Sequence, residues 1–147
     1  MRDNIGLHRG KRIDNNAWIY GYYFYDDFYK KAYITIGNYC IRADVESPNK
    51  RLLTVFEVIP ETVGQYTGLT DKNGKKIFEG DIVKSCEYDD VYFVKYFDDK
   101  NYPAFDCVPD VPLCECNGLS FLVNTEGCEI IGNIHDNPEL SRGKGNG

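Results

Sequence analysis

Residues 65–83 read Gln-Tyr-Thr-Gly-Leu-Thr-Asp-Lys-Asn-Gly-Lys-Lys-Ile-Phe-Glu-Gly-Asp-Ile-Val and contain two closely spaced turn signals. Residues 71–74 predict a tight turn, because an Asp side chain accepts hydrogen bonds from the backbone that follows it and because Asn and Gly tolerate positive φ. Residues 79–81 predict a second reversal, after which a strand should begin. Two tight turns with a short connector are typical of a small β-barrel, although an ordinary hairpin loop of an antiparallel sheet has the same turn chemistry.

The segments around this stretch have the composition and alternation of β-strands. Aromatic residues make up 14% of the chain, with 12 Tyr and 8 Phe, and such enrichment favours strands. Short helical turns are expected at residues 60–63, where Pro and Glu suit the start of a helix, and after Asn137, a capping residue that Pro follows. The chain is therefore predicted to be all-β with few short helical turns. Strands are expected at residues 18–25, 28–36, 39–45, 51–59, 81–88, 91–97, 104–108, 119–123 and 128–134.

The order of these segments predicts four regions. Residues 1–17 should be a loosely ordered lead-in, and residues 18–63 an N-terminal β-rich portion. Residues 64–140 should form a C-terminal module, and the Gly-rich residues 141–147 a disordered tail.

Composition limits the partners and the location of the protein. The chain of 147 residues has a formal net charge of −6, which argues against direct nucleic-acid binding because phosphate backbones repel an acidic chain. Residues 9–12 hold three positive charges, which we interpret as a solvated N-terminal segment. No apolar run approaches the roughly 20 residues of a membrane span, and no signal peptide is recognisable. We expect a cytoplasmic protein with reduced cysteines.

The aromatic run at residues 18–25 is the first candidate interaction site. Strand alternation places four aromatic side chains on one face and leaves Ile, Gly and two Tyr on the other. This pattern fits an internal strand that is covered on both faces. It fits a subunit interface equally well, because Tyr and Trp are favoured interface anchors. The candidate interface residues are Trp18, Tyr20, Tyr22 and Phe24.

Four cysteines form a candidate metal site. Four thiolates could bind a structural zinc ion tetrahedrally, but their spacing differs from the paired Cys-x-x-Cys pattern of zinc ribbons. A cysteine in a predicted strand also serves as a small apolar core residue. The candidate zinc ligands are Cys107, Cys114, Cys116 and Cys128.

The remaining polar residues do not form a recognisable catalytic pattern. The two histidines, His8 and His135, lie far apart in the sequence, and no Ser/His/Asp or Cys/His arrangement can be argued from spacing. Acidic pairs such as Asp26-Asp27 and Asp89-Asp90 coincide with predicted turns. Paired acids can hold a cation or transfer protons, but their position at turns favours a role as solvated loop residues.

Three separated blocks of the sequence resemble the YopX family, small proteins encoded by phages, prophages and mobile elements of Gram-positive bacteria. They are residues 65–83, residues 9–21 with Arg-Gly-Lys-Arg and Trp-Ile-Tyr-Gly, and residues 130–140 with Ile-Ile-Gly-Asn-Ile-His-Asp-Asn-Pro-Glu-Leu. Asn16-Ala17 departs from the Gly-Glu that relatives usually have. The resemblance implies an SH3-like barrel after the N-terminal β-rich portion. It implies no reaction, because the family has no established activity.

Together these patterns predict a non-catalytic protein that binds another protein or assembles with itself as a homo-oligomer. Two alternatives stay open. An acidic binder could mimic nucleic acid or occupy a basic site on a host protein. An unrecognised enzyme would need its clustered acids or His135 to converge in one pocket.

Overall fold

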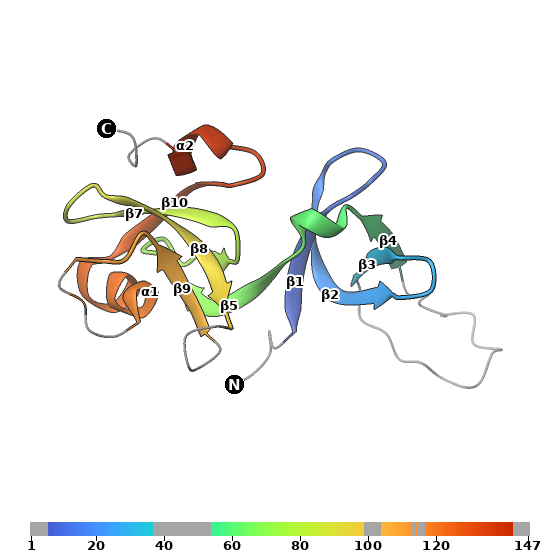
Figure 1. The fold of residues 1–147 in the computed structure, drawn as a ribbon, viewed down its shortest axis with the longest axis horizontal. Helices are drawn as coiled ribbons and strands as arrows, with labels where there is room; N and C mark the ends of the chain where they lie inside the picture. The colour runs from blue at the N-terminus through green and yellow to red at the C-terminus, as the bar shows by residue number, and fades with distance from the viewer. Residues whose placement is uncertain (1–5, 37–53, 99–103, 113, 115–116, 143–147) are drawn as a thin grey trace. The chain divides into compact units, whose positions relative to one another are not determined.

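A computed structural model describes residues 6–36, 54–98, 104–112, 114 and 117–142 of the chain (Figure 1). The structure is mostly β and contains antiparallel sheets, which confirms the all-β prediction. Its contacts divide the chain into two compact units. The N-terminal unit comprises residues 6–65, and the C-terminal unit comprises the described residues from position 66 onward.

The N-terminal unit is an antiparallel sheet with the strand order β4-β3-β2-β1-β5. Only the first two residues of β5 belong to this unit, where they pair with β1. A short 3₁₀ turn, η1, follows β4 as the sequence predicts. The elements are β1 Leu7–Lys11, β2 Trp18–Asp26, β3 Lys31–Ile36, β4 Thr54–Val58, η1 Pro60–Thr62 and β5 Gly64–Thr70.

This sheet curls on itself. Beyond the end of β1, an isolated bridge joins Arg12 to Val58 of β4, and the Ile59 N–H donates to the Lys11 carbonyl oxygen at 2.8 Å. We call the inner side of the curl the core face and the other side the outer face. The core face buries Ala32, Ile34 and Val58, with Ile19, Ile36 and Val63 packed against them.

Glycine permits the tight curvature at one central position. Gly21 of β2 lies on the core face, and a Cβ atom there would collide with the carbonyl oxygen of Thr35. The same atom would lie 3.0 Å from a methyl carbon of Ile34 and of Ile36. Gly within such an aromatic run indicates a bulge or a close backbone approach, and the structure shows the close approach.

The C-terminal unit contains a four-stranded sheet of order β10-β7-β8-β9. Among the described strands the pairing ends at β10 and at β9, so the sheet is open, and the expected closed SH3-like barrel is wrong. A short hairpin of β5 and β6 precedes this sheet. The elements are β6 Lys76–Phe78, β7 Asp81–Ser85, β8 Val91–Phe97, β9 Ala104–Val108, α1 Gly118–Phe121, η2 Leu122–Glu126, β10 Cys128–Asn133 and α2 Pro138–Arg142.

A continuous helix of α1 and η2 replaces the strand expected at residues 119–123. Asn117 caps it, because its side-chain oxygen accepts a hydrogen bond from the Ser120 N–H at 2.9 Å. Leu119 and Leu122 are fully buried, and their spacing of three residues places them on one side of a helix rather than on opposite faces of a strand. Both pack into the C-terminal core with Val83, Val94 and five other buried residues, and the helix lies beside β9 (Figure 1).

Other expectations differ from the structure in smaller ways. Residues 7–11 of the expected loose lead-in form β1. The strand expected at residues 28–36 begins at Lys31, and the one expected at 81–88 ends at Ser85. The strand expected at 39–45 and most of the expected disordered tail lie outside the described residues. The strands at 91–97 and 104–108 are confirmed.

Candidate functional site

The strand β2 brings the four candidate interface residues to the outer face of the N-terminal unit. The register pairs Tyr22 with both Leu7 and Thr35, and Phe24 with Tyr33, and directly paired residues share a face. We call the set of Trp18, Tyr20, Tyr22 and Phe24 the aromatic column. Three of its side chains are exposed, Tyr20 at 48%, Tyr22 at 44% and Phe24 at 44%.

Neighbouring side chains hold two of these rings in place. The ring of Phe24 stacks on Tyr33 of β3 with centroids 4.9 Å apart and an interplanar angle of 19°. At the other end of the column, the guanidinium of Arg9 lies 4.8 Å from the centroid of the Trp18 ring, and the ammonium of Lys11 lies 5.5 Å from it. Arg9 is only 6% exposed, so this basic segment is an ordered strand and the prediction of a solvated segment is wrong.

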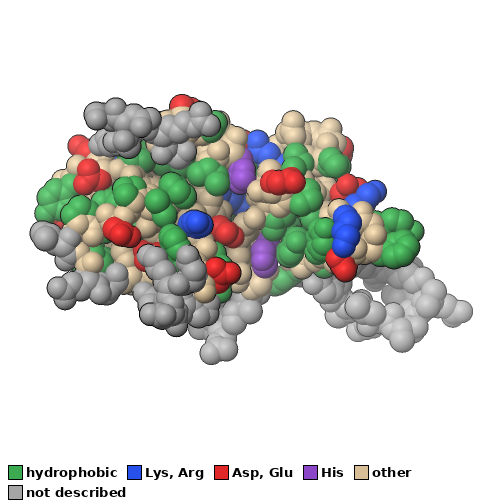
Figure 2. Space-filling model, in the orientation of Figure 1, with side chains coloured by type: hydrophobic (Ala, Val, Ile, Leu, Met, Phe, Trp, Pro, Cys, Tyr) green, Lys and Arg blue, Asp and Glu red, His purple; other side chains and the backbone are tan. Residues whose placement is uncertain are grey.

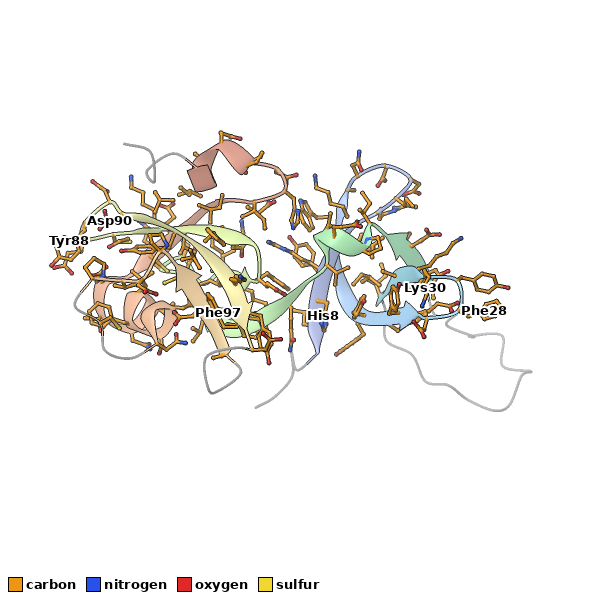
Figure 3. The ribbon with its side chains drawn as sticks, viewed as in Figure 1. His8, Phe28, Lys30, Tyr88, Asp90 and Phe97 are labelled. Carbon is orange, nitrogen blue, oxygen red and sulfur yellow. The ribbon has the colours of Figure 1, made fainter. Side chains whose placement is uncertain are left out.

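The turn between β2 and β3 adds two exposed aromatic side chains. Phe28 is 84% exposed and Tyr29 is 68% exposed. The carboxylate of Asp26 fixes the turn, because its Oδ1 accepts hydrogen bonds from the backbone N–H groups of Phe28 at 2.9 Å and Tyr29 at 3.1 Å. Phe28 and Lys30 project from this turn at the end of the unit (Figure 3). At the same end, hydrophobic side chains lie at the surface beside basic and acidic ones (Figure 2).

Sequence reasoning did not single out Phe28 as a surface residue. Phe28 lies in a stretch that the sequence predicts to be a strand, and in a strand the alternation of faces would determine its exposure. The pair Asp26-Asp27 could have predicted the exposure of Phe28, because it predicts a turn whose following residues point away from the sheet. β2 itself is not covered on both faces, since Tyr23 is 37% and Tyr25 is 44% exposed on the other side of the strand.

The three buried carboxylates of Asp71, Asp81 and Asp106 accept hydrogen bonds from backbone N–H groups at separate places in the fold. Asp81 Oδ2 accepts a hydrogen bond from the Phe78 N–H at 2.7 Å, and Asp106 Oδ1 accepts from Cys107 at 2.8 Å and Leu119 at 3.1 Å. Each of these acids stabilises a turn or a helix start. Their geometry therefore supports a structural role.

Asp71, in the turn at residues 71–74, accepts hydrogen bonds from three backbone N–H groups. Its Oδ1 accepts hydrogen bonds from Asn73 and Lys75, both at 2.9 Å, and its Oδ2 accepts from Ile130 at 3.1 Å. Burial opposes ionisation, but the hydrogen bonds from Ile130, Lys75 and Asn73 and the charge of Lys75 hold the pKa of Asp71 below its usual value. Gly74 completes the turn at φ 79°, so the turn predicted at residues 71–74 is confirmed.

The cysteine candidates lie mainly in the C-terminal core. Cys107 and Cys128 are buried and Cys114 packs against the same core, while Cys116 lies outside the described residues. Burial raises the pKa of Cys107 to about 12 and that of Cys128 to about 11, which favours the protonated thiol over the thiolate that binds metal. Within the described part of the chain, no three His, Cys, Asp or Glu side chains gather in a way that could hold a metal ion.

The two histidines lie in separate local settings. The Nδ1 atom of His8, in β1, lies 2.7 Å from the carbonyl oxygen of Gly6. The centroids of the His8 and Tyr23 rings are 5.2 Å apart. The backbone N–H of His135 donates to Asn133 Oδ1 at 3.0 Å, within the turn that leads to α2.

Hydrogen bonds from other segments occupy backbone groups at both outer edges of the C-terminal sheet. At β10, the Lys72 N–H donates to the Cys128 carbonyl oxygen at 2.9 Å, and the Ile130 N–H donates to Asp71. At β9, the Phe105 carbonyl oxygen accepts a hydrogen bond from Asn117 Nδ2 at 2.7 Å. These contacts occupy backbone groups with which another strand would pair.

Comparison with known proteins identifies the family. The profile of the YopX family, described as YopX protein, matches residues 8–141. The chain therefore belongs to the YopX family. No curated protein matches it.

Among the solved structures with a similar fold is the "Crystal structure of protein EF1440 from Enterococcus faecalis". It superposes with a TM-score of 0.54 at 24% sequence identity, over 91% of this chain and 96% of that chain. No helix among the described residues is long and apolar enough to cross a membrane.

Proposed function

We propose that this YopX protein is a non-catalytic protein-binding module that acts in the bacterial cytoplasm in the service of a phage or another mobile element. The aromatic column on the outer face of the N-terminal unit is the binding surface. The family resemblance implies that the protein serves a phage or another mobile element.

The observation that carries this proposal is the exposure of Tyr20, Tyr22 and Phe24 on one face of an ordered strand. Large aromatic side chains supply much of the binding energy in protein interfaces because they bury a large area with few rotatable bonds. Exposed apolar patches of this kind mark interaction sites in folded proteins.

The two alternative functions have less support. An enzyme using clustered acids needs carboxylates that converge, whereas Asp71, Asp81 and Asp106 each accept backbone hydrogen bonds at separate turns. A nucleic-acid mimic needs a broad surface of one charge. Ion pairs at the surface, such as Lys30 with Asp27 and Lys84 with Asp89, place both signs of charge side by side.

The test is photo-crosslinking from the aromatic column in cells that express the protein. The photoreactive residue p-benzoylphenylalanine replaces Tyr22, and a matched variant carries it at Tyr88, which is 62% exposed in the C-terminal unit. We expect a discrete protein adduct from position 22 and none from position 88. Absence of any protein adduct from position 22 would overturn the proposal.

A further inference from the structure

We propose that the bound protein contributes an extended segment that pairs, as an additional β-strand, with the second half of β2. The segment lies along residues 23–26, and its side chains pack against the rings on both faces of β2. This inference rests on the proposed function and names the mode of binding and the chemistry of the partner. In such complexes backbone hydrogen bonds supply affinity, and the alternating side chains supply specificity.

The second half of β2 has a neighbouring strand on one side. β1 pairs with residues 18–22 of β2, and β3 pairs with residues 22–26 on the opposite side. Gly6, which precedes β1, has a φ of 80° and therefore leaves the extended conformation. Beyond Tyr22, β2 bends away from β1 toward its turn (Figure 1). Among the described residues, none pairs with residues 23–26 on the side of β1.

Thr35 shows which way the peptide groups of this stretch point. A Cβ atom at Gly21 would collide with the Thr35 carbonyl oxygen, so this oxygen points toward β2. The Thr35 hydroxyl also donates to the Tyr22 carbonyl oxygen at 3.4 Å. Thr35 and Tyr22 therefore form a hydrogen-bonded pair of the ladder. Because peptide groups alternate sides along a strand, those of Tyr23 and Tyr25 point to the side that lacks a strand.

Other strand edges of the described chain carry hydrogen bonds from elsewhere in the fold. On the outer side of β4, the Ile13 N–H donates to the Glu57 carbonyl oxygen at 3.1 Å. Lys72 and Asn117 bond to the edges of the C-terminal sheet. Folded proteins protect open edges with such contacts, with charged side chains or with proline. Residues 22–25 contain neither charge nor proline, so this edge is left suited to pairing.

Aromatic rings flank the open edge on both faces of β2. Tyr22 and Phe24 are exposed on the outer face, and Tyr23 and Tyr25 are exposed on the other. An added strand places its side chains directly beside these rings, where aromatic and β-branched partners pair best. A single segment would thus cover rings on both faces, which packing against one face alone cannot do.

The charged groups next to this stretch already have partners. The Asp26 carboxylate accepts hydrogen bonds from the backbone of its own turn, and Lys31 forms an ion pair with Glu57 at 3.6 Å. A charged side chain on the added strand would have to be desolvated against the rings without a new partner. We therefore infer that the bound segment carries uncharged, aromatic or β-branched side chains.

The first experiment is NMR hydrogen exchange of the purified full-length chain, which tests the open edge without a partner. The amides of Tyr23 and Tyr25 should exchange at least about 100-fold faster than those of Tyr22 and Phe24, because only the latter pair bonds to β3. Equal protection of all four amides would show that the edge is occupied within the chain and would overturn the proposal.

The second experiment removes one N–H group from the edge. Photo-crosslinking from position 22 is repeated in cells with Tyr25→Pro and with Tyr25→Ala, which loses the same ring but keeps the N–H. Proline is tolerated in a strand where the N–H faces solvent. The adduct should be at least about tenfold weaker with Tyr25→Pro than with Tyr25→Ala, because strand pairing loses a backbone hydrogen bond. Equal adduct yields would overturn strand addition.

A second matched pair guards against misfolding. Tyr23→Pro and Tyr23→Ala repeat the comparison at the other N–H of the edge, and thermal unfolding of each purified variant identifies the pairs that fold. At least one proline variant should fold, because neither N–H belongs to the ladder with β3. Failure of both to fold would contradict the open edge and overturn the proposal.

Mass spectrometry of the adduct identifies the segment that position 22 contacts. We expect a run of uncharged residues rich in aromatic or β-branched side chains in another protein. A crosslinked run with adjacent charged residues would overturn the inferred chemistry of the segment. A crosslink to a second copy of this chain would overturn the proposed partner.

The outcomes separate this inference from the proposed function. An adduct from position 22 that persists equally with Tyr25→Pro and Tyr25→Ala would sustain the proposed function and overturn strand addition. Absence of any adduct from position 22 would overturn both.

Discussion

At the scale of single residues, Asp71 connects parts of the chain that are distant in sequence. Its carboxylate accepts hydrogen bonds within its own turn and also from Ile130, which lies 59 residues further along. Hydrogen bonds to a charged acceptor are among the stronger ones in proteins. The turn at residues 71–74 is therefore held by hydrogen bonds within the turn and by one to β10.

Replacing Asp71 by Asn should destabilise the protein by about 1–3 kcal/mol at pH 7, because a charged acceptor of three backbone N–H groups is lost. The pKa of Asp71 is lowered in the folded state. Its contribution is therefore complete above its unfolded pKa of about 4 and is lost as the pH falls through the folded pKa. Urea unfolding at pH 7 and pH 3 measures this, and the gap between wild type and Asp71→Asn should shrink at pH 3.

The control for this prediction is Asp89→Asn, which removes an exposed carboxylate paired with Lys84 at 3.3 Å. Exposed ion pairs contribute little, so this variant should stay within about 0.5 kcal/mol of wild type. A gap between wild type and Asp71→Asn that is the same at both pH values would contradict the assigned role of the charge.

Gly21 and Gly74 are needed for different reasons. Gly21 is needed because there is no room for a side chain, and Gly74 because its backbone has a positive φ. Gly21→Ala should cost about 1–3 kcal/mol, because the new methyl group meets the Thr35 carbonyl oxygen and two Ile side chains. Gly74→Ala meets no atom within 4 Å but must adopt φ 79°, which costs about 1–2 kcal/mol. Denaturant unfolding gives both values. Only Gly21→Ala should also alter the near-UV circular dichroism of the β2 aromatic residues.

At the scale of secondary-structure elements, the sequence was informative where periodicity was strict. Residues 91–97 alternate regularly, and β8 has those bounds. Residues 119–123 are a short apolar run, for which strand and helix cannot be told apart by periodicity alone. Two local features distinguish the helix from a strand. Asn117 caps the start of the helix, and Leu119 and Leu122 both lie on its buried side.

Features that depend on distant segments could not be predicted in the same way. The curl of the N-terminal sheet requires Arg12 to meet Val58, and no local pattern encodes that pairing. The sequence could predict that the four candidates share one face of β2, because alternation within one strand is a local property. Their exposure was not predictable, because it depends on which elements cover the face. The open C-terminal sheet differs from a barrel for the same reason, since turn chemistry specifies reversals but not closure.

The capping of the α1–η2 helix can be tested directly. Asn117→Ala removes the hydrogen bond to the Ser120 N–H and the one to the Phe105 carbonyl oxygen of β9. We expect a loss of about 1–2 kcal/mol in the free energy of unfolding. Asn124→Ala, which removes only an exposed bond to Ser120 Oγ at 3.2 Å, should change it by less than about 0.5 kcal/mol. Similar losses in both variants would show that the cap is not the stabilising feature.

At the scale of the whole molecule, the two units have cores of different kinds. The N-terminal core is small and aliphatic, with Ala32, Ile34 and Val58 at its centre. The C-terminal core is larger and includes Tyr92, Cys107 and Cys128. Burial raises the pKa of Tyr92 to about 12, as it raises those of the two thiols. The stability of the C-terminal unit should therefore depend on alkaline pH.

The sign follows from the direction of these shifts. The folded protein holds the thiol protons more tightly than the unfolded chain, so stability is complete below the unfolded pKa of about 8.5 and falls as the pH rises above it. We expect a slope of up to about 1.4 kcal/mol per pH unit for each buried thiol. Urea unfolding of reduced protein between pH 7 and pH 10 measures this slope.

Two variants check the assignment of the slope. The double variant Cys107→Ala/Cys128→Ala should be less stable at pH 7 but should show a shallower alkaline slope, because neither buried thiol remains to lose its proton. Cys86→Ala, at an exposed cysteine, should leave the slope unchanged. An equal slope in wild type and the double variant would refute the assignment.

The contact between Asp71 and Ile130 also has a consequence for synthesis of the chain on the ribosome. The N-terminal unit is a contiguous segment that ends at residue 65, so its fold can form while later residues are still being added. The turn at residues 71–74 emerges soon afterwards, but the last donor to the Asp71 carboxylate is Ile130, 59 residues further along the chain. The C-terminal unit can therefore complete its sheet only after residue 130 has left the ribosome, and until then the nascent chain exposes the apolar face of β7 and β8 to the cell.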